Sequence, residues 1–162
     1  MALELGHPDG DALIFCGLAG GLHAHLPTGT IVIPDEVRRP DGTTMRCDAE
    51  LVDALQAGAK KLGFEPVVAA ILTAESVVVG DERQRWSAEG YAAADMETGL
   101  LRAPRVAAVR VILDTPLREL SRDWLNPARA FLKPWNWPQA AWLAREAPRC
   151  AALAARVIAT LA

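Results

Sequence analysis

The stretch Val109-Arg110-Val111-Ile112-Leu113-Asp114 is an apolar run, rich in β-branched residues, that ends on a carboxylate. Such a run predicts a strand buried in a sheet. Just upstream, Ala93-Ala94-Asp95-Met96-Glu97 places a second carboxylate where a short apolar run passes into a predicted helix. A charged group at the end of a buried strand is costly unless it is paired or used in chemistry. We therefore expect Glu97 and Asp114 to share one pocket, with Asp95 as a candidate helix cap.

The composition is typical of one soluble α/β domain. The chain has 162 residues, of which 51% are hydrophobic and 23% charged, enough to bury a core. A net charge of -3 provides no basic surface, so we expect no nucleic acid partner. Three cysteines far apart, Cys16, Cys47 and Cys150, form no metal-binding pattern and favour a reducing, cytoplasmic setting. We expect no signal peptide and no membrane span.

A glycine-rich segment follows the first predicted strand. The apolar residues within 11–16 predict that strand, and Gly17-Leu18-Ala19-Gly20-Gly21-Leu22 then predicts a turn. Small residues after a strand let a ligand approach the backbone closely. The glycine spacing differs from the dinucleotide-binding fingerprint. A tight turn without a ligand and a ligand-binding turn both remain open.

Strands and helices alternate along the rest of the chain. We expect strands over 30–34, 66–73, 91–94 and 106–113, and helices over 48–61, 81–89, 98–102 and 148–162. In the first of these helices, Asp48 is the predicted cap and Gly63 follows the end. The alternation predicts a mostly parallel sheet covered on both faces. Because ligands bind at the carboxyl ends of such strands, segments 17–21 and 75–78 are expected to meet Glu97 and Asp114 there.

A tryptophan-rich region precedes the final predicted helix. Four tryptophans, Trp124, Trp135, Trp137 and Trp142, occur close together with Pro127, Pro134 and Pro138. The prolines predict that this region, which includes Phe131, does not form one long helix. The rings either cover the core beside the last helix or form a wall for a hydrophobic substituent or a subunit.

Four blocks in this order resemble the nucleoside phosphorylase/nucleosidase family, which includes purine nucleoside phosphorylase and methylthioadenosine/S-adenosylhomocysteine nucleosidase. They are GLAGGL at 17–22, GTIVIPDEV at 29–37, DME at 95–97 and VRVILD at 109–114. The tryptophan-rich tail looks most like the hopanoid-associated branch. The resemblance implies a single domain over 1–162, a three-layer α/β/α sandwich around a twisted mixed, mostly parallel sheet, without the family's first strand or strands. It also implies a homodimer or higher homo-oligomer.

The resemblance also implies roles for particular residues. Asp114 would be the acid at the purine N7, and Glu97 would accept hydrogen bonds from the ribose hydroxyls. Apolar contacts would come from Met96 to the ribose and from Val77 and Val78 to the base. Two residues of the glycine-rich block, Ala19 and Gly20, would also line the substrate site. No metal or cofactor is implied, except phosphate as a co-substrate.

These residue types suit the cleavage of an N-glycosidic bond. Cleavage builds positive charge on the sugar and negative charge on the departing base, so an acid near the base helps by roughly 10²–10⁴-fold. Burial would favour the protonated form of Asp114. A carboxylate that holds the sugar hydroxyls, Glu97, orients the sugar and stabilises its charge. The structural alternative is that Asp114 caps a turn while Glu97 pairs with Arg110.

The sequence departs from the family pattern where the nucleophile should bind. Phe15 and Leu18 replace the Arg and Ser of bacterial phosphorylases, and Leu113 replaces a serine. In the family's phosphorylases, an earlier strand and a glycine-containing loop help to hold phosphate. In its nucleosidases, the same region supplies a glutamate that activates water. We expect both features to be missing here. Two functions therefore remain open. The chain is either a purine nucleoside phosphorylase or nucleosidase, or a catalytically silent nucleoside-binding or scaffold homologue.

Overall fold

The computed structural model describes residues 2–3, 12–126, 128, 130 and 132–161, and within them the strands form one nine-stranded mixed sheet. Its order is β5-β4-β7-β8-β2-β9-β3-β6, with β1 also paired to β2. The strands are β1 (Ala2–Leu3), β2 (Ala12–Gly21), β3 (Ile31–Ile33), β4 (Glu36–Arg38), β5 (Thr44–Arg46), β6 (Val67–Val68), β7 (Ile71–Thr73), β8 (Ala93–Asp95) and β9 (Arg105–Ile112). The helices are α1 (Ala49–Lys61), α2 (Gly80–Ala88) and α4 (Trp137–Ile158), with short 3₁₀ turns η1 (Thr98–Leu100), η2 (Arg122–Leu125), η3 (Pro134–Asn136) and η4 (Ala159–Leu161).

The centre of the sheet is the parallel pair of β2 and β9. Gly17 lies opposite Arg110 in this pair, and Ala19 lies opposite Ile112. Three further pairs are parallel, β3–β6, β4–β7 and β7–β8, while β1–β2, β2–β8, β3–β9 and β4–β5 are antiparallel. The predicted α/β class with a mixed sheet is confirmed.

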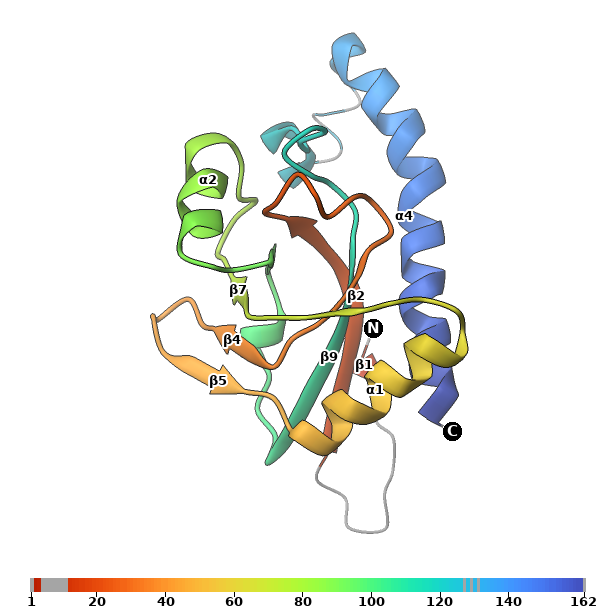
Figure 1. Ribbon diagram of the computed structural model, residues 1–162. Coiled ribbons are helices and arrows are strands. Elements are labelled where there is room, and N and C mark those ends of the chain that lie inside the picture. Colours follow the sequence, from red (N-terminus) through yellow and green to blue (C-terminus); the bar gives the residue numbers. More distant parts are fainter. Residues whose placement is uncertain (1, 4–11, 127, 129, 131, 162) are drawn as a thin grey trace.

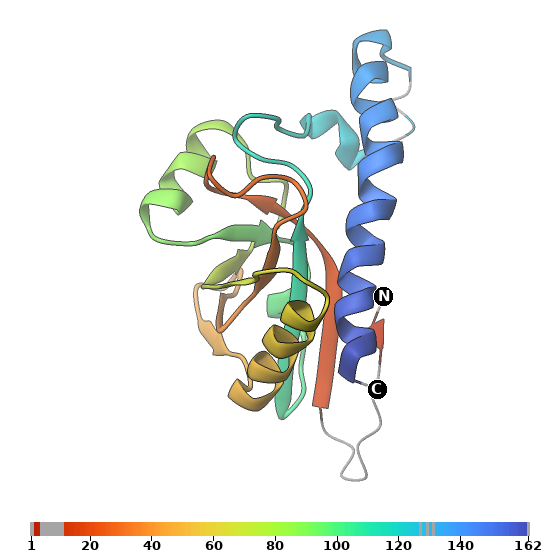
Figure 2. The same ribbon diagram turned by 45° about the vertical axis from the view of Figure 1, so that its right-hand side comes forward.

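The helices lie on both sides of this central pair (Figures 1 and 2). On one side, α1 and α4 pack against residues of β9 such as Val109 and Val111, which are fully buried. On the other side lies α2. Because side chains alternate across a strand, Arg110 and Ile112 face away from α1 and α4, and Arg110 contacts Thr98 of η1 there. Strand β9 is buried on both faces, as its apolar run predicts.

Helix α1 forms as the sequence predicts. The Asp48 carboxylate accepts a hydrogen bond from the Leu51 amide at 3.1 Å, which caps the helix. Val52 and Leu55 are buried on its inner side. Gly63 follows the helix with φ of +83°, a conformation that suits glycine.

The last helix is longer than predicted. Helix α4 begins at Trp137 and contains Pro148, which was expected to start it. Pro138 lies in the first turn, where a missing amide hydrogen costs little. Within the helix, Pro148 removes one hydrogen bond, at a cost of about 3 kcal/mol. The buried face of α4, which includes Ala154 and Val157, offsets this cost.

The tryptophans of this region have different environments. Trp142 is buried, and the Arg118 guanidinium lies 4.5 Å above its ring. Trp135 and Trp137 are 72% and 60% exposed. The interpretation as core cover is therefore right for Trp142 and wrong for Trp135 and Trp137. Pro127 and Phe131, which were part of the same expectation, lie outside the described residues.

Three further predictions differ from the structure. The segment 17–21, expected as a turn, continues β2, and its glycines have ordinary backbone angles. The predicted strand over 66–73 divides into β6 and β7, because these pair with different neighbours. The predicted helix over 98–102 is a single 3₁₀ turn, since the chain is already extended at Leu101.

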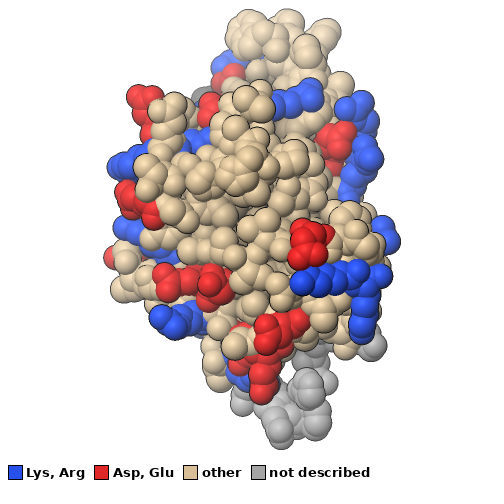
Figure 3. All heavy atoms as spheres, in the orientation of Figure 1, with Lys and Arg blue, Asp and Glu red and all other residues tan. Residues whose placement is uncertain are grey.

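The surface shows no dominant charge of one sign in the view of Figure 3. Lys and Arg alternate with Asp and Glu around the rim of this face. Among the residues that the structure describes, no helix has the length and apolar character needed to cross a membrane.

Candidate functional site

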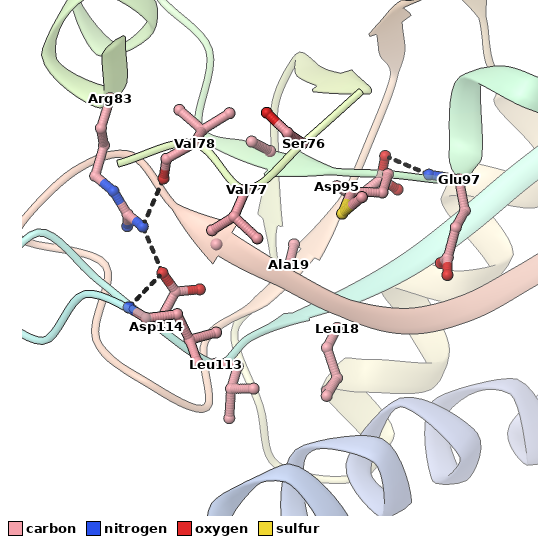
Figure 4. Close-up of a pocket in the computed structure, with 14 residues that line it drawn as sticks. Leu18, Ala19, Ser76, Val77, Val78, Arg83, Asp95, Glu97, Leu113 and Asp114 are labelled. Atoms are coloured by element: carbon pink, nitrogen blue, oxygen red, sulfur yellow. Dashed lines mark hydrogen bonds and ion pairs between the residues drawn. The ribbon is translucent and has the colours of Figure 1, made fainter. Parts of the chain in front are cut away.

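All seven residues that the sequence analysis assigned to a site line one pocket (Figure 4). They are Ala19, Gly20, Val77, Val78, Met96, Glu97 and Asp114. The lining also includes Leu18, Ser76, Arg83, Ala94, Asp95, Leu113 and Leu120, which were not assigned to the site. The cavity of about 190 Å³ is smaller than the roughly 300–1,000 Å³ of typical small-molecule sites. It therefore has room for one portion of such a ligand.

The two carboxylates lie at opposite ends of this pocket. Strand β8 is antiparallel to β2, with Gly20 opposite Ala94, so the chain that leaves β8 runs back toward Leu18. Glu97 is therefore at that end, whereas Asp114 is at the carboxyl end of β9, and Ala19 lies between them (Figure 4). The prediction of one common carboxyl edge is wrong for β7 and β8, because these two strands are parallel to each other and run opposite to β2.

Asp114 is 4% exposed and is held through one of its two oxygens. Its Oδ2 accepts a hydrogen bond from Arg83 Nη2 and a long one, 3.5 Å, from the Leu120 amide. Its Oδ1 has no hydrogen-bond partner among the described residues and points into the pocket (Figure 4). Gly20 makes room for this arrangement, because a Cβ there would lie 3.0 Å from Oδ1.

Arg83 is the main site residue that the sequence analysis missed. It lies in α2 and is 2% exposed. Its guanidinium forms a buried ion pair with the Asp114 carboxylate. Asp114 therefore lies in an ion pair, not in the purely apolar surroundings from which its proton-holding role was argued. Nothing in the sequence of α2 distinguishes Arg83 from Arg85, which is 59% exposed, because both belong to one short polar helix.

Asp95 shapes the turn that carries Met96 and Glu97. It is 5% exposed and accepts hydrogen bonds from the Thr73 hydroxyl at 2.6 Å and from the backbone amides of Glu97 and Thr98 at 3.2–3.3 Å. These bonds stabilise the start of η1 from upstream, whereas the N-cap position of η1 is Glu97 and not Asp95 as predicted. They also fix the backbone from which Glu97 projects into the pocket.

Arg110 connects this turn to the central strand. Its guanidinium is fully buried, 2.5 Å from Asp95 Oδ2, and donates to the Thr98 hydroxyl at 2.7 Å. It also lies 3.3 Å from Glu97 Oε2 and 4.5 Å from the centre of the Phe15 ring. The structural alternative for Glu97, an ion pair with Arg110, is therefore observed. That contact orients Glu97 and leaves Oε1 without a partner among the described residues.

Apolar side chains form much of the remaining wall. Val77 and Leu113 flank the Asp114 end, and Leu18 lies toward Glu97 (Figure 4). Met96 is 41% exposed beside Glu97. Within the described part of the chain, no three His, Cys, Asp or Glu side chains lie close enough together to hold a metal ion. The pocket thus offers apolar surface with, at each end, one carboxylate oxygen that no residue in the described part of the chain binds.

The fold is shared with solved structures of nucleosidases at low sequence identity. One is S-adenosylhomocysteine nucleosidase from Streptococcus pyogenes in complex with 5-methylthiotubericidin (TM-score 0.71, 18% identity, covering 95% of this chain and 68% of that one). Another is a 5′-methylthioadenosine/S-adenosylhomocysteine nucleosidase from Colwellia psychrerythraea in complex with adenine (0.68, 17%, 94% and 66%). A third is futalosine hydrolase from Helicobacter pylori (0.67, 13%, 91% and 66%).

The chain spans about two thirds of these structures, between 64% and 68% of their length. No curated protein sequence matches it. A family model described as the phosphorylase superfamily matches residues 5–159, which is nearly the whole chain. The chain therefore belongs to the phosphorylase superfamily.

Proposed function

We propose that the chain binds a purine nucleoside or thio-nucleoside in this pocket and cleaves its N-glycosidic bond. The observation that carries the proposal is the pair of carboxylates, Asp114 and Glu97, at the two ends of one partly apolar pocket. Each has an oxygen that no described residue binds. The two related nucleosidase structures, one with 5-methylthiotubericidin and one with adenine, support a purine-type ligand.

The two ends suit the two charges that develop in the reaction. As the bond between C1′ and the base nitrogen breaks, its electron pair moves to the base. Asp114 Oδ1 is placed to transfer a proton or to hydrogen-bond at the base. At the other end, Glu97 would accept hydrogen bonds from the sugar hydroxyls and stabilise the positive charge on the sugar. Val77, Val78 and Met96 would supply apolar contact to the base and the ribose.

The group that attacks C1′ of the sugar is either water or phosphate. Water would make the reaction a hydrolysis, and phosphate as co-substrate would make it a phosphorolysis. Phe15 and Leu18 stand where bacterial phosphorylases of this family have an Arg and a Ser. The buried guanidinium beside Phe15 belongs to Arg110 and is already held by Asp95. These residues argue against a phosphate site of the bacterial phosphorylase kind, and the assay with and without phosphate decides between the two attacking groups.

The test is base release from adenosine, inosine and methylthioadenosine, measured with and without phosphate. We expect release of the free base, and its loss in Asp114→Asn. A phosphate requirement would identify phosphorolysis. If folded protein releases no base from any of the three nucleosides under either condition, the proposed activity is wrong.

A second function is a catalytically silent nucleoside-binding or scaffold protein. The residues at the nucleophile's position favour it, because Phe15 and Leu18 replace the polar residues that bind phosphate in bacterial phosphorylases of this family. Calorimetry with adenine and adenosine separates the two functions. Binding without turnover would support this alternative, and a folded chain that binds neither compound would retain only an interaction role.

We also propose that the chain forms a homodimer or a higher homo-oligomer, as the family resemblance implies. Closed symmetric assemblies of this kind are the commonest oligomers. Light scattering at high micromolar concentration should give a mass at least twice the 17.4 kDa of one chain. A monomer under these conditions would contradict the proposal.

A further inference from the structure

We infer that Arg83 is a positioning residue for Asp114 and that Glu119 in turn holds Arg83. The inference rests on the proposed function of the pocket. It assigns two charged residues to the base-binding end, neither of which the sequence analysis placed in the site.

Arg83 is surrounded by oxygen atoms from three parts of the chain. Its Nη1 donates to the Gly21 carbonyl at 2.5 Å, and its Nη2 donates to the Val78 carbonyl at 3.0 Å and to Asp114 Oδ2. Its Nε lies 3.1 Å from Glu119 Oε1. One buried guanidinium therefore connects the end of β2, the apolar wall at Val78 and the carboxylate of Asp114.

This arrangement leaves Asp114 one oxygen for a ligand. A carboxylate that is free to rotate would present either oxygen to the pocket. The bond from Arg83 to Oδ2, together with the Leu120 amide, fixes the plane of the group and directs Oδ1 inward (Figure 4). Binding is tighter when such a group is held in its productive orientation before the ligand arrives.

Glu119 provides Arg83 with a second counter-ion. Its Oε1 also accepts a hydrogen bond from the Gly80 amide at 2.9 Å, so it ties the loop after β9 to the start of α2. The Gln139 side chain of α4 donates to the Glu119 carbonyl at 2.8 Å. A buried cation left without any partner is strongly destabilising. Glu119 therefore holds the Arg83 guanidinium from a second side and keeps it against Asp114.

The test is a double-mutant cycle on base binding, measured by calorimetry with adenine and hypoxanthine as probes. Arg83→Met should weaken binding of the better-bound probe by roughly tenfold or more, equivalent to about 1.4 kcal/mol. In an Asp114→Asn background the same change should alter binding by less than about twofold, because Arg83 acts through Asp114. Arg83→Lys should retain part of the affinity. A matched control, Arg85→Met in the same helix, should leave binding unchanged.

Glu119→Gln provides a second variant, because Arg83→Met leaves Asp114 without its counter-ion and can prevent folding. We expect a smaller loss of affinity that disappears in the Asp114→Asn background. Equal losses from Arg83→Met or Glu119→Gln with and without Asp114 would overturn the inference, since a purely structural role gives additive effects.

The outcomes also separate this inference from the proposed activity. Coupled losses in binding without base release from wild-type protein would reject the activity alone. Base release with uncoupled binding losses would reject the role of Arg83 alone. A folded chain that neither binds the probes nor releases base would reject both.

Discussion

Gly17→Ala tests how tightly Arg110 is held beneath the site. A Cβ at position 17 would lie 2.2 Å from Arg110 Nη1, whereas ordinary contacts are 3.4–4 Å. The guanidinium would have to move by more than 1 Å, and it is fully buried between Asp95 and Thr98. In an unstrained strand, Ala is more favourable than Gly by roughly 0.5–1 kcal/mol. Strand propensity therefore predicts that Gly17→Ala raises the free energy of unfolding, whereas packing predicts that it lowers it.

The cost of packing should exceed the gain from strand propensity. Overpacking a buried site costs about 1–3 kcal/mol. Breaking the buried pair of Arg110 and Asp95 costs about 3–5 kcal/mol. We expect Gly17→Ala to lower the free energy of unfolding by about 3 kcal/mol. For a chain of this size, that corresponds to a fall in Tm of roughly 6–12 °C.

Urea unfolding followed by circular dichroism measures this change, with Gly20→Ala in the same strand for comparison. At Gly20 the added Cβ would lie 3.0 Å from Asp114 Oδ1, so stability should fall less. Base binding should be affected instead, because Oδ1 faces the pocket. If Gly17→Ala loses less than about 1 kcal/mol, below the usual cost of overpacking, the packing argument is wrong. Arg110 would then have room to move without breaking its pair.

Four other expectations follow from the structure. Trp142→Ala should cost about 3–5 kcal/mol in urea unfolding because the ring is buried. Trp135→Ala should stay within about ±0.5 kcal/mol, and a large loss there would contradict its exposed position. Hydrogen bonds from Arg105 hold the pKa of Asp48 below its usual value. The ionised Asp48 therefore stabilises the folded protein fully above the unfolded pKa of about 3.9. This stabilisation is lost as the pH falls through the lower pKa of the folded state. Asp48→Asn, which retains a capping side chain, should show a weaker loss of stability between pH 5 and pH 2 than wild type, both measured by urea unfolding. Burial raises the pKa of Cys47 to about 12, so iodoacetamide should alkylate it slowly at pH 8, and rapid labelling of the native protein would refute this.

Local sequence patterns predicted the elements that depend on near neighbours. The cap at Asp48 and the glycine at position 63 gave the correct limits of α1, because both act within one turn of the helix. The apolar run before Asp114 gave β9, because burial on both faces requires it. The resemblance to a family added the set of residues that line the pocket.

The glycine-rich segment shows where local patterns failed. Gly17 and Gly20 predicted a turn because glycine is common in turns. In the structure they continue β2, and a side chain is excluded there because a Cβ would lie 2.2 Å from Arg110 Nη1 at position 17 and 3.0 Å from Asp114 Oδ1 at position 20. The reason for these glycines is thus a contact with residues more than 90 positions away. No window along the sequence contains that information.

The sequence by itself determined the α/β class, the two carboxylates and the apolar residues between them. Only the tertiary structure decided the direction of β8, the burial of Arg83 and the pairing of each carboxylate with an arginine. The physical reason is that periodicity and capping depend on residues within a few positions of each other. The Arg83–Asp114 pair joins residues 31 positions apart, and it forms only when α2 and β9 close around the pocket. Which arginine becomes buried is therefore decided by packing, not by its own sequence neighbourhood.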